Sequence, residues 1–449
     1  MRKFWPAVVA VVLVAAAVVM VLQRRQVQWS TANPEALAFF RDGLAASMKY
    51  YRNDARRCFA KAVEADPSFT VAKAFLLNHL DPRSDAEGVA ALIAELDGAD
   101  LGPLTPRERF LVERAVATAR RDLNKASALT EAFTARCPDD PFGLFHAGQD
   151  AVLGGDLRRA RRAFERLLES DPNWVMAYNH LGYIAMAEGK LDDAERMFTT
   201  YRFIAPDQAN PHDSLGELYL LTGRLDEAER EFELAIQARL DFRFSYENLV
   251  RVETLRGDES GVDAALFRAR ESGAVPPEAL ARLECWARGW LAAREGDWEA
   301  VAELAEDACG ANLPLDLVLR AALFTARREM EAQVMQRLAS YKEDGGGLPA
   351  SRLDLQATAL YLEGIRAAGA GELARAAELF RAAAAAGSLW GFSRGFARLC
   401  AWSSEARALE KLGRPGEAAG ALAAMRAVNP RAHEILAKAT DLPVPSPTS

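Results

Sequence analysis

A pattern of small and aromatic residues recurs along the chain about every 34 residues. Each copy has a glycine, an alanine twelve positions later and a phenylalanine after four more. The clearest copies are Gly43, Ala55 and Phe59; Gly148, Ala160 and Phe164; Gly182, Ala194 and Phe198; Gly216, Ala228 and Phe232; and Gly364, Ala376 and Phe380. A fixed period of this size is typical of a solenoid, in which each repeat unit buries its apolar face only against its neighbours. The pattern therefore predicts a binding protein and not a catalyst.

Each predicted repeat unit consists of two helices, as residues 175–208 illustrate. Gly182 lies on the apolar stripe of a first helix, Ala194 and Phe198 lie on the stripe of a second one, and Pro206 ends it. We expect the small residues Gly182 and Ala194 to allow a close approach of the two helices. The unit is then an antiparallel helix pair.

This pattern resembles the tetratricopeptide repeat, whose signature positions are filled here by Tyr178, Gly182, Ala194, Phe198 and Pro206. The resemblance implies an all-α fold, a right-handed superhelical solenoid of about eleven helix-turn-helix units. The register predicts a linker at 26–35, units near 36–69, 70–103, 107–140, 141–174, 175–208, 209–242, 243–276, 282–315, 316–350, 357–390 and 399–432, and a disordered tail at 441–449.

Composition agrees with a helical fold and argues against nucleic-acid binding. Half of the 449 residues are hydrophobic, and alternating β-branched runs are rare beyond the N-terminus. The formal net charge is −8, whereas a general nucleic-acid binder needs cations to displace phosphate counterions. The arginine-rich run at 158–166 is an exception, which we interpret as a solvated helix face, with a lipid or phosphate patch as the alternative.

Residues 1–25 predict one transmembrane helix that anchors the chain. Trp5 to Leu22 is an uncharged run of about 27 Å if helical, at the lower edge of a bilayer span, with basic residues on both sides. A cleaved signal peptide is the alternative, but no small-residue cleavage site precedes a polar start. The flanking Lys and Arg residues are balanced, two on each side, and the α-amino group slightly favours an orientation with the repeats outside the cytoplasm, at a bacterial inner membrane.

The five cysteines are scattered and lie mostly in predicted helices, which is not the pattern of a disulfide framework. They are Cys58, Cys137, Cys285, Cys309 and Cys400. We expect them to be small buried hydrophobic residues. No cysteine has a histidine at a metal-binding distance along the sequence, so no metal site is predicted.

One formal match to a catalytic motif occurs, Gly-x-Ser-x-Gly at Gly391–Gly395. That motif activates its serine on a turn between a strand and a helix, whereas helices are expected on both sides here. His433 is the only histidine after Ser393, and no aspartate stands between them. We therefore expect a loop that joins two units, and we predict no catalytic residue, cofactor or small-molecule substrate.

The resemblance also implies where a partner would bind. In this family the first helices line the concave face, and the second, fifth, sixth and ninth positions of a unit contact bound peptide. These positions are Phe142, Phe145, His146 and Gln149; Met176, Asn179, His180 and Tyr183; Asn210, Asp213, Ser214 and Glu217; and Phe244, Glu247, Asn248 and Arg251. If His146 and His180 are exposed there, their protonation would change partner affinity between about pH 7.5 and 5.5. Packing between units is the alternative role for both histidines.

Two hypotheses for the function follow. The first is a membrane-tethered scaffold that binds a segment of a protein partner of unknown identity in its concave groove. The second is a sensor or regulatory arm of a bacterial signalling system. The segments Asn33–Leu37 and Leu104–Arg109 are similar to openings of repeat regions in bacterial membrane-linked serine/threonine kinases and nucleotide cyclases.

Overall fold

The computed structural model describes residues 29–443 apart from 83, 308, 311 and 344–348, and these residues form helices and turns without any strand. The prediction of an all-helical fold is thereby confirmed for the described part of the chain. The predicted anchor at 1–25 lies outside the described residues. Within the described ranges, no helix has the length and apolar character that a membrane crossing requires.

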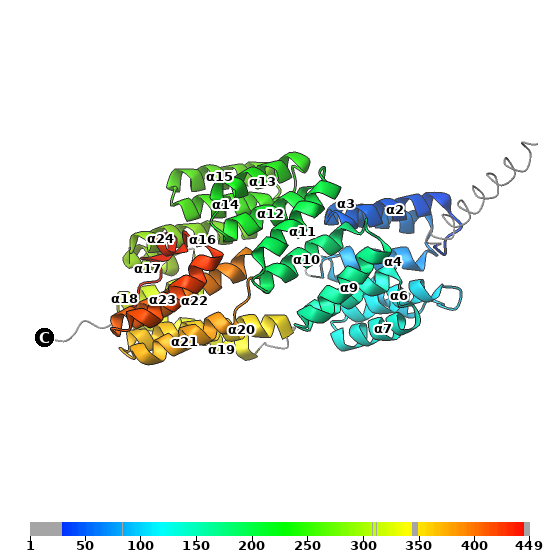
Figure 1. Ribbon diagram of the computed structural model, residues 1–449. Coiled ribbons are helices and arrows are strands. Elements are labelled where there is room, and N and C mark those ends of the chain that lie inside the picture. The colour runs from blue at the N-terminus through cyan, green and yellow to red at the C-terminus, as the bar shows by residue number, and fades with distance from the viewer. Residues whose placement is uncertain (1–28, 83, 308, 311, 344–348, 444–449) are drawn as a thin grey trace, which may run out of the picture. The chain divides into compact units, whose positions relative to one another are not determined.

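The chain divides into two compact parts, the first ending at Pro138 and the second starting at Asp139. The helices of the N-terminal part are α2 (Pro34–Met48), α3 (Arg52–Ala65), α4 (Thr70–His79), α5 (Ala86–Asp97), α6 (Pro106–Ala119) and α7 (Leu123–Arg136). Consecutive helices pack in antiparallel pairs, as the short turns between them require (Figure 1).

The C-terminal part continues the same alternation of first and second helices. Its helices are α8 (Pro141–Leu153), α9 (Leu157–Ser170), α10 (Val175–Ala187), α11 (Leu191–Ile204), α12 (Ala209–Leu221), α13 (Leu225–Ala238), α14 (Arg243–Arg256), α15 (Glu259–Ser272), α16 (Pro277–Glu295), α17 (Trp298–Glu306), α18 (Leu315–Phe324), α19 (Arg328–Glu343), α20 (Pro349–Gly369), α21 (Leu373–Ala386), α22 (Gly391–Lys411), α23 (Pro415–Val428) and α24 (Ala432–Leu436). One large apolar core extends from α10 to the end of this part.

The repeated glycine makes room for the phenylalanine ring sixteen residues later. A Cβ atom added to Gly182 would lie 2.3 Å from Cε1 of Phe198, and one added to Gly148 would lie 2.5 Å from Cζ of Phe164. All five repeated phenylalanines are fully buried. The close approach in each unit is therefore between a helix backbone and an aromatic ring, and not chiefly between Gly182 and Ala194 as the sequence suggested.

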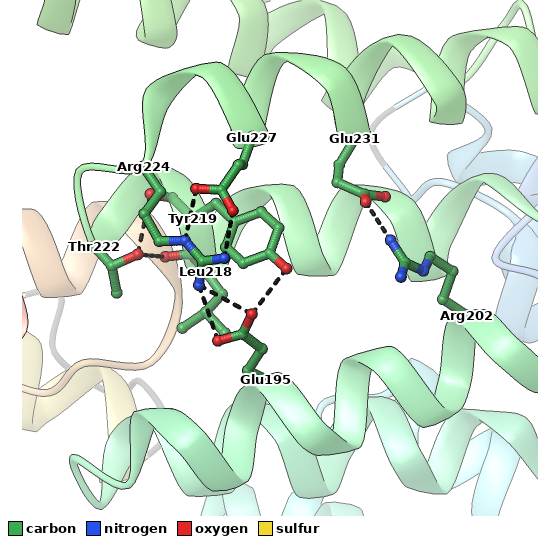
Figure 2. Close-up of polar contacts among 8 residues, drawn as sticks. All are labelled: Glu195, Arg202, Leu218, Tyr219, Thr222, Arg224, Glu227 and Glu231. Carbon is green, nitrogen blue, oxygen red and sulfur yellow. Dashed lines mark hydrogen bonds and ion pairs between the residues drawn. The ribbon is translucent and has the colours of Figure 1, made fainter.

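Polar contacts also tie neighbouring units together (Figure 2). The carboxylate of Glu195 on α11 accepts hydrogen bonds of 2.9 Å from the Tyr219 hydroxyl on α12 and from Nη1 of Arg224. The same guanidinium group lies 3.9 Å above the Tyr219 ring and is paired with Glu227. These contacts fix the register between consecutive helix pairs in addition to the apolar packing.

Helix α22, the first helix of its repeat unit, is 21 residues long and starts at Gly391. This start lies eight residues before the unit that the sequence predicted at 399. The Gly-x-Ser-x-Gly match is thus the start of a helix, and the expectation of a loop there is wrong. Gly395 does not end the helix, because it packs against another element: a Cβ at this position would lie 2.6 Å from Cδ1 of Leu221 on α12. The two extra turns of α22 therefore lie against α12, far away in sequence.

Two cysteines depart from the expectation of isolated buried thiols. Cys285 on α16 and Cys309 after α17 form a disulfide, with their Cα atoms 5.4 Å apart. The long gap between them and the absence of a paired spacing concealed this bond in the sequence. Of the three free cysteines, Cys400 is buried as expected, whereas Cys58 and Cys137 are half-buried.

The start of the expected tail at 441–449 is packed. Leu442 is only 2% exposed, and the carbonyl oxygen of Asp441 accepts a hydrogen bond from the buried guanidinium group of Arg320. An apolar residue and a buried donor thus hold this end of the chain in place. Residues 444–449 lie outside the described part.

Candidate functional site

The predicted groove residues on α10, α12 and α14 form a buried hydrogen-bond network. The Ser214 hydroxyl donates to Oδ1 of Asn179 over 2.8 Å. Oδ1 of Asp213 accepts from the Ser245 hydroxyl over 2.8 Å and from Nδ2 of Asn248 over 3.2 Å. All five side chains are buried. Their polar groups join adjacent first helices to one another, which differs from the open groove that the sequence predicted.

Asp213 is a buried carboxyl group with an altered acidity. Burial, and then the nearby charge of Glu217, raise its pKa to about 7. The hydrogen bonds from Ser245 and Asn248 act in the opposite direction because they favour the ionised form, but their effect is smaller. This carboxyl group therefore changes its charge near neutral pH.

The start of α22 covers the middle of the predicted groove. Glu217 accepts a hydrogen bond of 2.6 Å from the Tyr183 hydroxyl and another of 2.8 Å from the backbone N–H of Phe392. The Trp390 ring stacks on the Tyr183 ring at a centroid distance of 5.6 Å. An acidic side chain at the first turn of a helix satisfies a backbone donor that has no partner within the helix. A segment of the same chain therefore occupies this surface.

The aromatic end of the predicted groove is a packed cluster. The His180 ring stacks on Phe164 at 4.6 Å and lies 5.7 Å from the ring of Phe145. Burial lowers the pKa of His180 to about 4, so its ring stays neutral between pH 7.5 and 5.5. The condition for this pH response, an exposed ring, is thus not met by His180, and the alternative role of packing between units agrees with its contacts to Phe164 and Phe145. His146 lies on the same helix as Gln149, with Nδ1 and Oε1 3.2 Å apart.

The other end of the predicted groove is charged and open. Glu247 lies 3.8 Å from Arg243 and 3.6 Å from Arg251. Nη1 of Arg251 also donates to Oδ1 of Asn248 over 2.5 Å. Glu247, Arg243 and Arg251 line a cavity together with Trp286, which the sequence reasoning missed. Trp286 and Trp290, four positions apart on α16, were the feature of the sequence that could have indicated an aromatic surface here.

The remaining predicted residues have mixed surroundings. Phe142 and Met176 are half-buried, Asn210 is buried, and Phe244 is exposed. The binding role of the whole predicted set stays a prediction. The arginine run at 158–166 lies on α9, where Arg161 pairs with Glu188 over 2.9 Å, in keeping with a solvated and paired helix face.

A second candidate surface consists of exposed apolar side chains on the second helices α11, α13 and α15 and in the turn that follows α13, which we call the outer patch. Its members are Phe203 (84% exposed), Leu234, Leu240 (73%) and Phe267 (62%). Ion pairs between residues that neighbour them, Arg202 with Glu231 and Arg268 with Glu233, connect the three helices. Clustered exposed apolar side chains of this kind commonly mark interaction surfaces.

The described residues contain neither a hydrogen-bonded pair of Ser393 and His433 nor a three-residue metal cluster. Ser393 lies in the first turns of α22 and His433 lies on α24, and among the described residues no hydrogen bond joins them. The described histidines, cysteines and carboxylates contain no group of three that could hold a metal ion.

Comparison with known proteins identifies one repeat in this chain and finds solved structures of low overall similarity to it. The tetratricopeptide repeat family model matches residues 211–242, which contain most of α12 and all of α13. No curated protein matches the chain. The helix pair of α12 and α13 is thus similar to one tetratricopeptide repeat, and the described part of the chain is a succession of such helix pairs.

Among solved structures, a tetratricopeptide repeat protein from Parabacteroides merdae is 14% identical, covers 56% of this chain and 97% of its own, and has a TM-score of 0.39. PilW, described as a widely conserved type IV pilus biogenesis factor, is 16% identical, covers 44% and 89%, and has a TM-score of 0.37. MamA from Desulfovibrio magneticus is 17% identical, covers 39% and 97%, and has a TM-score of 0.33. Such scores carry no argument about function.

Proposed function

We propose that the chain is a protein-binding scaffold that residues 1–25 tether to a membrane, and that a partner segment binds the outer patch. The observation that carries this proposal is the exposure of Phe203, Leu240 and Phe267 on adjacent repeats. Large apolar side chains gain free energy when a partner removes them from water. An apolar partner segment, helical or extended, would satisfy this surface.

The part of the concave face that α10 and α12 form is less accessible to a partner. Tyr183 and Glu217 already bind the start of α22 through a stacked ring and a backbone hydrogen bond. A partner there would first have to displace α22, whose Gly395 is packed tightly against Leu221. The half-buried residues Phe142 and Met176 of α8 and α10 are the second candidate contact surface, which the family resemblance favours.

A photo-crosslinking experiment with the full chain in its native membrane tests the proposal. A benzoylphenylalanine at position 203 or 267 should crosslink to one and the same partner, whereas one at the exposed position Gly420 on α23 should not. In the Phe203→Ser/Phe267→Ser double variant, binding to that partner should weaken by about 2 kcal/mol or more if either ring is a central contact.

The alternatives give different results. Crosslinks between two copies of the chain would indicate self-association and refute a heterologous partner. Loss of binding in a Phe142→Ala variant, with no loss in the double variant, would move the site to the face of α8 and α10.

The tether has its own test, because it rests on residues 1–25 alone. Carbonate washing should leave the full chain in the membrane pellet and release a chain that starts at Gln26; release of the full chain would refute the anchor. The Cys285–Cys309 disulfide supports our proposal that the repeats lie outside the cytoplasm, because disulfides persist in oxidising compartments. The sensor-arm hypothesis stays a prediction.

A further inference from the structure

A cavity of about 390 Å³, which we call the aromatic cavity, lies beside α22 in the C-terminal part of the chain. Side chains of α16, α18, α20 and α21 also line it. Helices α20, α21 and α22 pack against one another in succession, and α18 packs against α20 (Figure 1). Its lining differs from that of the charged cavity at Glu247, although Trp286 belongs to both.

The aromatic cavity opens to solvent at one side and is buried at the other. Thr358, Ser393 and Ala397 line it and are exposed, so they mark the opening. The buried members of the lining include Trp290, Tyr361, Leu362, Phe396, Cys400 and Ala401. Water finds few hydrogen-bond partners on such an apolar lining, so a ligand that displaces it gains free energy.

Small side chains on three helices make the room. Ala357 on α20, Ala383 on α21 and Ala401 on α22 line the aromatic cavity where larger residues would fill it. Its volume of about 390 Å³ is about two and a half times the roughly 150 Å³ of an apolar cavity that holds a benzene molecule. Ligand sites in proteins commonly have volumes in this range. The volume therefore suits a molecule of about two fused rings.

The Trp286 ring has a face on which no other aromatic ring of the described residues stacks. Its ring contacts with Trp290, Phe392 and Phe396 are tilted or edge-on, at interplanar angles of 48°, 81° and 64°. Trp286 is also only half-buried, whereas Trp290 and Phe396 beside it are buried. A flat ring that enters the aromatic cavity can thus stack on Trp286 without displacing another aromatic side chain.

Covalent and close packing contacts fix the position of this aromatic wall. Cys285, which precedes Trp286 on α16, forms the disulfide with Cys309. A Cβ atom added to Gly289 would lie 2.5 Å from Cδ2 of Leu313, so α16 also packs closely against the segment that leads to α18. The end of that segment and the start of α18 line the aromatic cavity too. A ligand therefore does not have to order these parts of the site when it binds.

Charged groups of both signs line the aromatic cavity as well. They are the carboxyl group of Asp316 and the guanidinium groups of Arg394 and Arg398. A ligand ion of either sign would therefore approach a like charge while it loses its own hydration. The Tyr361 hydroxyl, also in the lining, already accepts a hydrogen bond of 2.9 Å from the buried Arg320. These surroundings favour a ligand without net charge.

We propose that the aromatic cavity binds a small, uncharged, planar aromatic molecule that stacks on Trp286 and packs against Phe396. The apolar lining removes both faces of such a ring system from water, and the stacked contact adds to the free energy of this burial. A saturated molecule with the same ring skeleton is puckered and cannot lie flat on an indole ring. Planarity and charge are therefore the two properties of the ligand that an experiment should vary.

A titration with three related compounds tests the proposal. They are coumarin, which is planar and uncharged, octahydrocoumarin, which is saturated and uncharged, and coumarin-3-carboxylate, which is planar and anionic. The full chain in a phosphatidylcholine nanodisc, which accommodates its apolar N-terminal segment, is titrated by calorimetry, and the heats measured with empty nanodiscs are subtracted. Coumarin should bind about fivefold or more tightly than either of the others. Equal or tighter binding of octahydrocoumarin would refute a planar ligand, and equal or tighter binding of the carboxylate would refute an uncharged one.

Variants locate the site. Trp286→Leu should weaken coumarin binding about fivefold, because leucine is apolar but has no ring face. Ala397→Trp should abolish binding, because the new side chain would fill the opening of the aromatic cavity. Ala419→Trp makes the same change at an exposed position on α23 and should leave binding unchanged.

The thermal midpoint of each variant, measured in parallel, shows whether the fold is retained. Undiminished coumarin binding in folded Trp286→Leu and Ala397→Trp would refute the proposal even if the three compounds rank as expected. Should Trp286→Leu fail to fold, Ala397→Trp decides alone, since its exposed position tolerates a larger side chain.

Discussion

Ionisation of Asp213 should make the free energy of unfolding of the C-terminal part depend on pH. Replacement of Asp213 by asparagine should remove this dependence. The pKa of Asp213 is about 7 in the folded chain, against an ordinary value of 3.8. Between these values the unfolded chain has lost the proton that the folded chain keeps. The unfolded state therefore binds fewer protons, and the free energy of unfolding falls as pH rises from about 4 to 7.

The size of this effect follows from the pKa difference. About three pKa units correspond to about 4 kcal/mol, of which ~2.5 kcal/mol develops between pH 5 and pH 8. Asparagine has nearly the same shape, cannot ionise, and keeps an oxygen that can accept from Ser245. The free energy of unfolding of the Asp213→Asn variant, relative to that of the natural chain, should therefore rise by ~2.5 kcal/mol between pH 5 and pH 8.

Urea unfolding of the full chain at several pH values, followed by circular dichroism, measures this difference. The two compact parts can unfold separately, so the transition that the variant shifts is the one to compare. Asp207→Asn, in the exposed turn before α12, is a matched control that should leave the pH profile unchanged. A constant difference between Asp213→Asn and the natural chain across this range would refute the reasoning, because Asp213 would then titrate alike in both states.

Two further predictions concern packing and covalent structure. Gly182→Ala should cost about 1–3 kcal/mol, because its new methyl group would overlap the buried Phe198 ring, whereas Gly420→Ala meets open space on α23 and should stabilise the chain by up to about 1 kcal/mol. Equal thermal shifts would contradict this assignment. Thiol alkylation of the denatured, unreduced chain should label three of the five cysteines, and reduction of Cys285–Cys309 should lower stability by about 3 kcal/mol; labelling of all five would disprove the bond.

The sequence by itself determined the local architecture. The spacing of Gly182, Ala194 and Phe198 predicted a helix pair, and the same spacing elsewhere predicted the stacking of pairs. These features are readable because each repeat unit packs mainly on its immediate neighbours, so the same residue types return at the same interval. The sequence also placed Glu247 and Arg251 on the concave face as partner contacts, and the structure shows that they line a cavity.

Only the tertiary structure decided what lies on the concave face. Phe392 reaches Glu217 across 175 residues, and Nδ2 of Asn429 donates to the carbonyl oxygen of Leu221 across 208 residues. Contacts between residues so far apart in the sequence occur once and have no period, so no sequence pattern predicts them. They place α22 against Tyr183 and Glu217, which a repeat-by-repeat interpretation left open, and they bring Phe392 to the cavity that Glu247 and Arg251 line. Packing between neighbouring repeat units recurs at a fixed interval and can therefore be predicted from the sequence. The contacts of α22 and Asn429 with α12 occur only in the assembled fold and cannot.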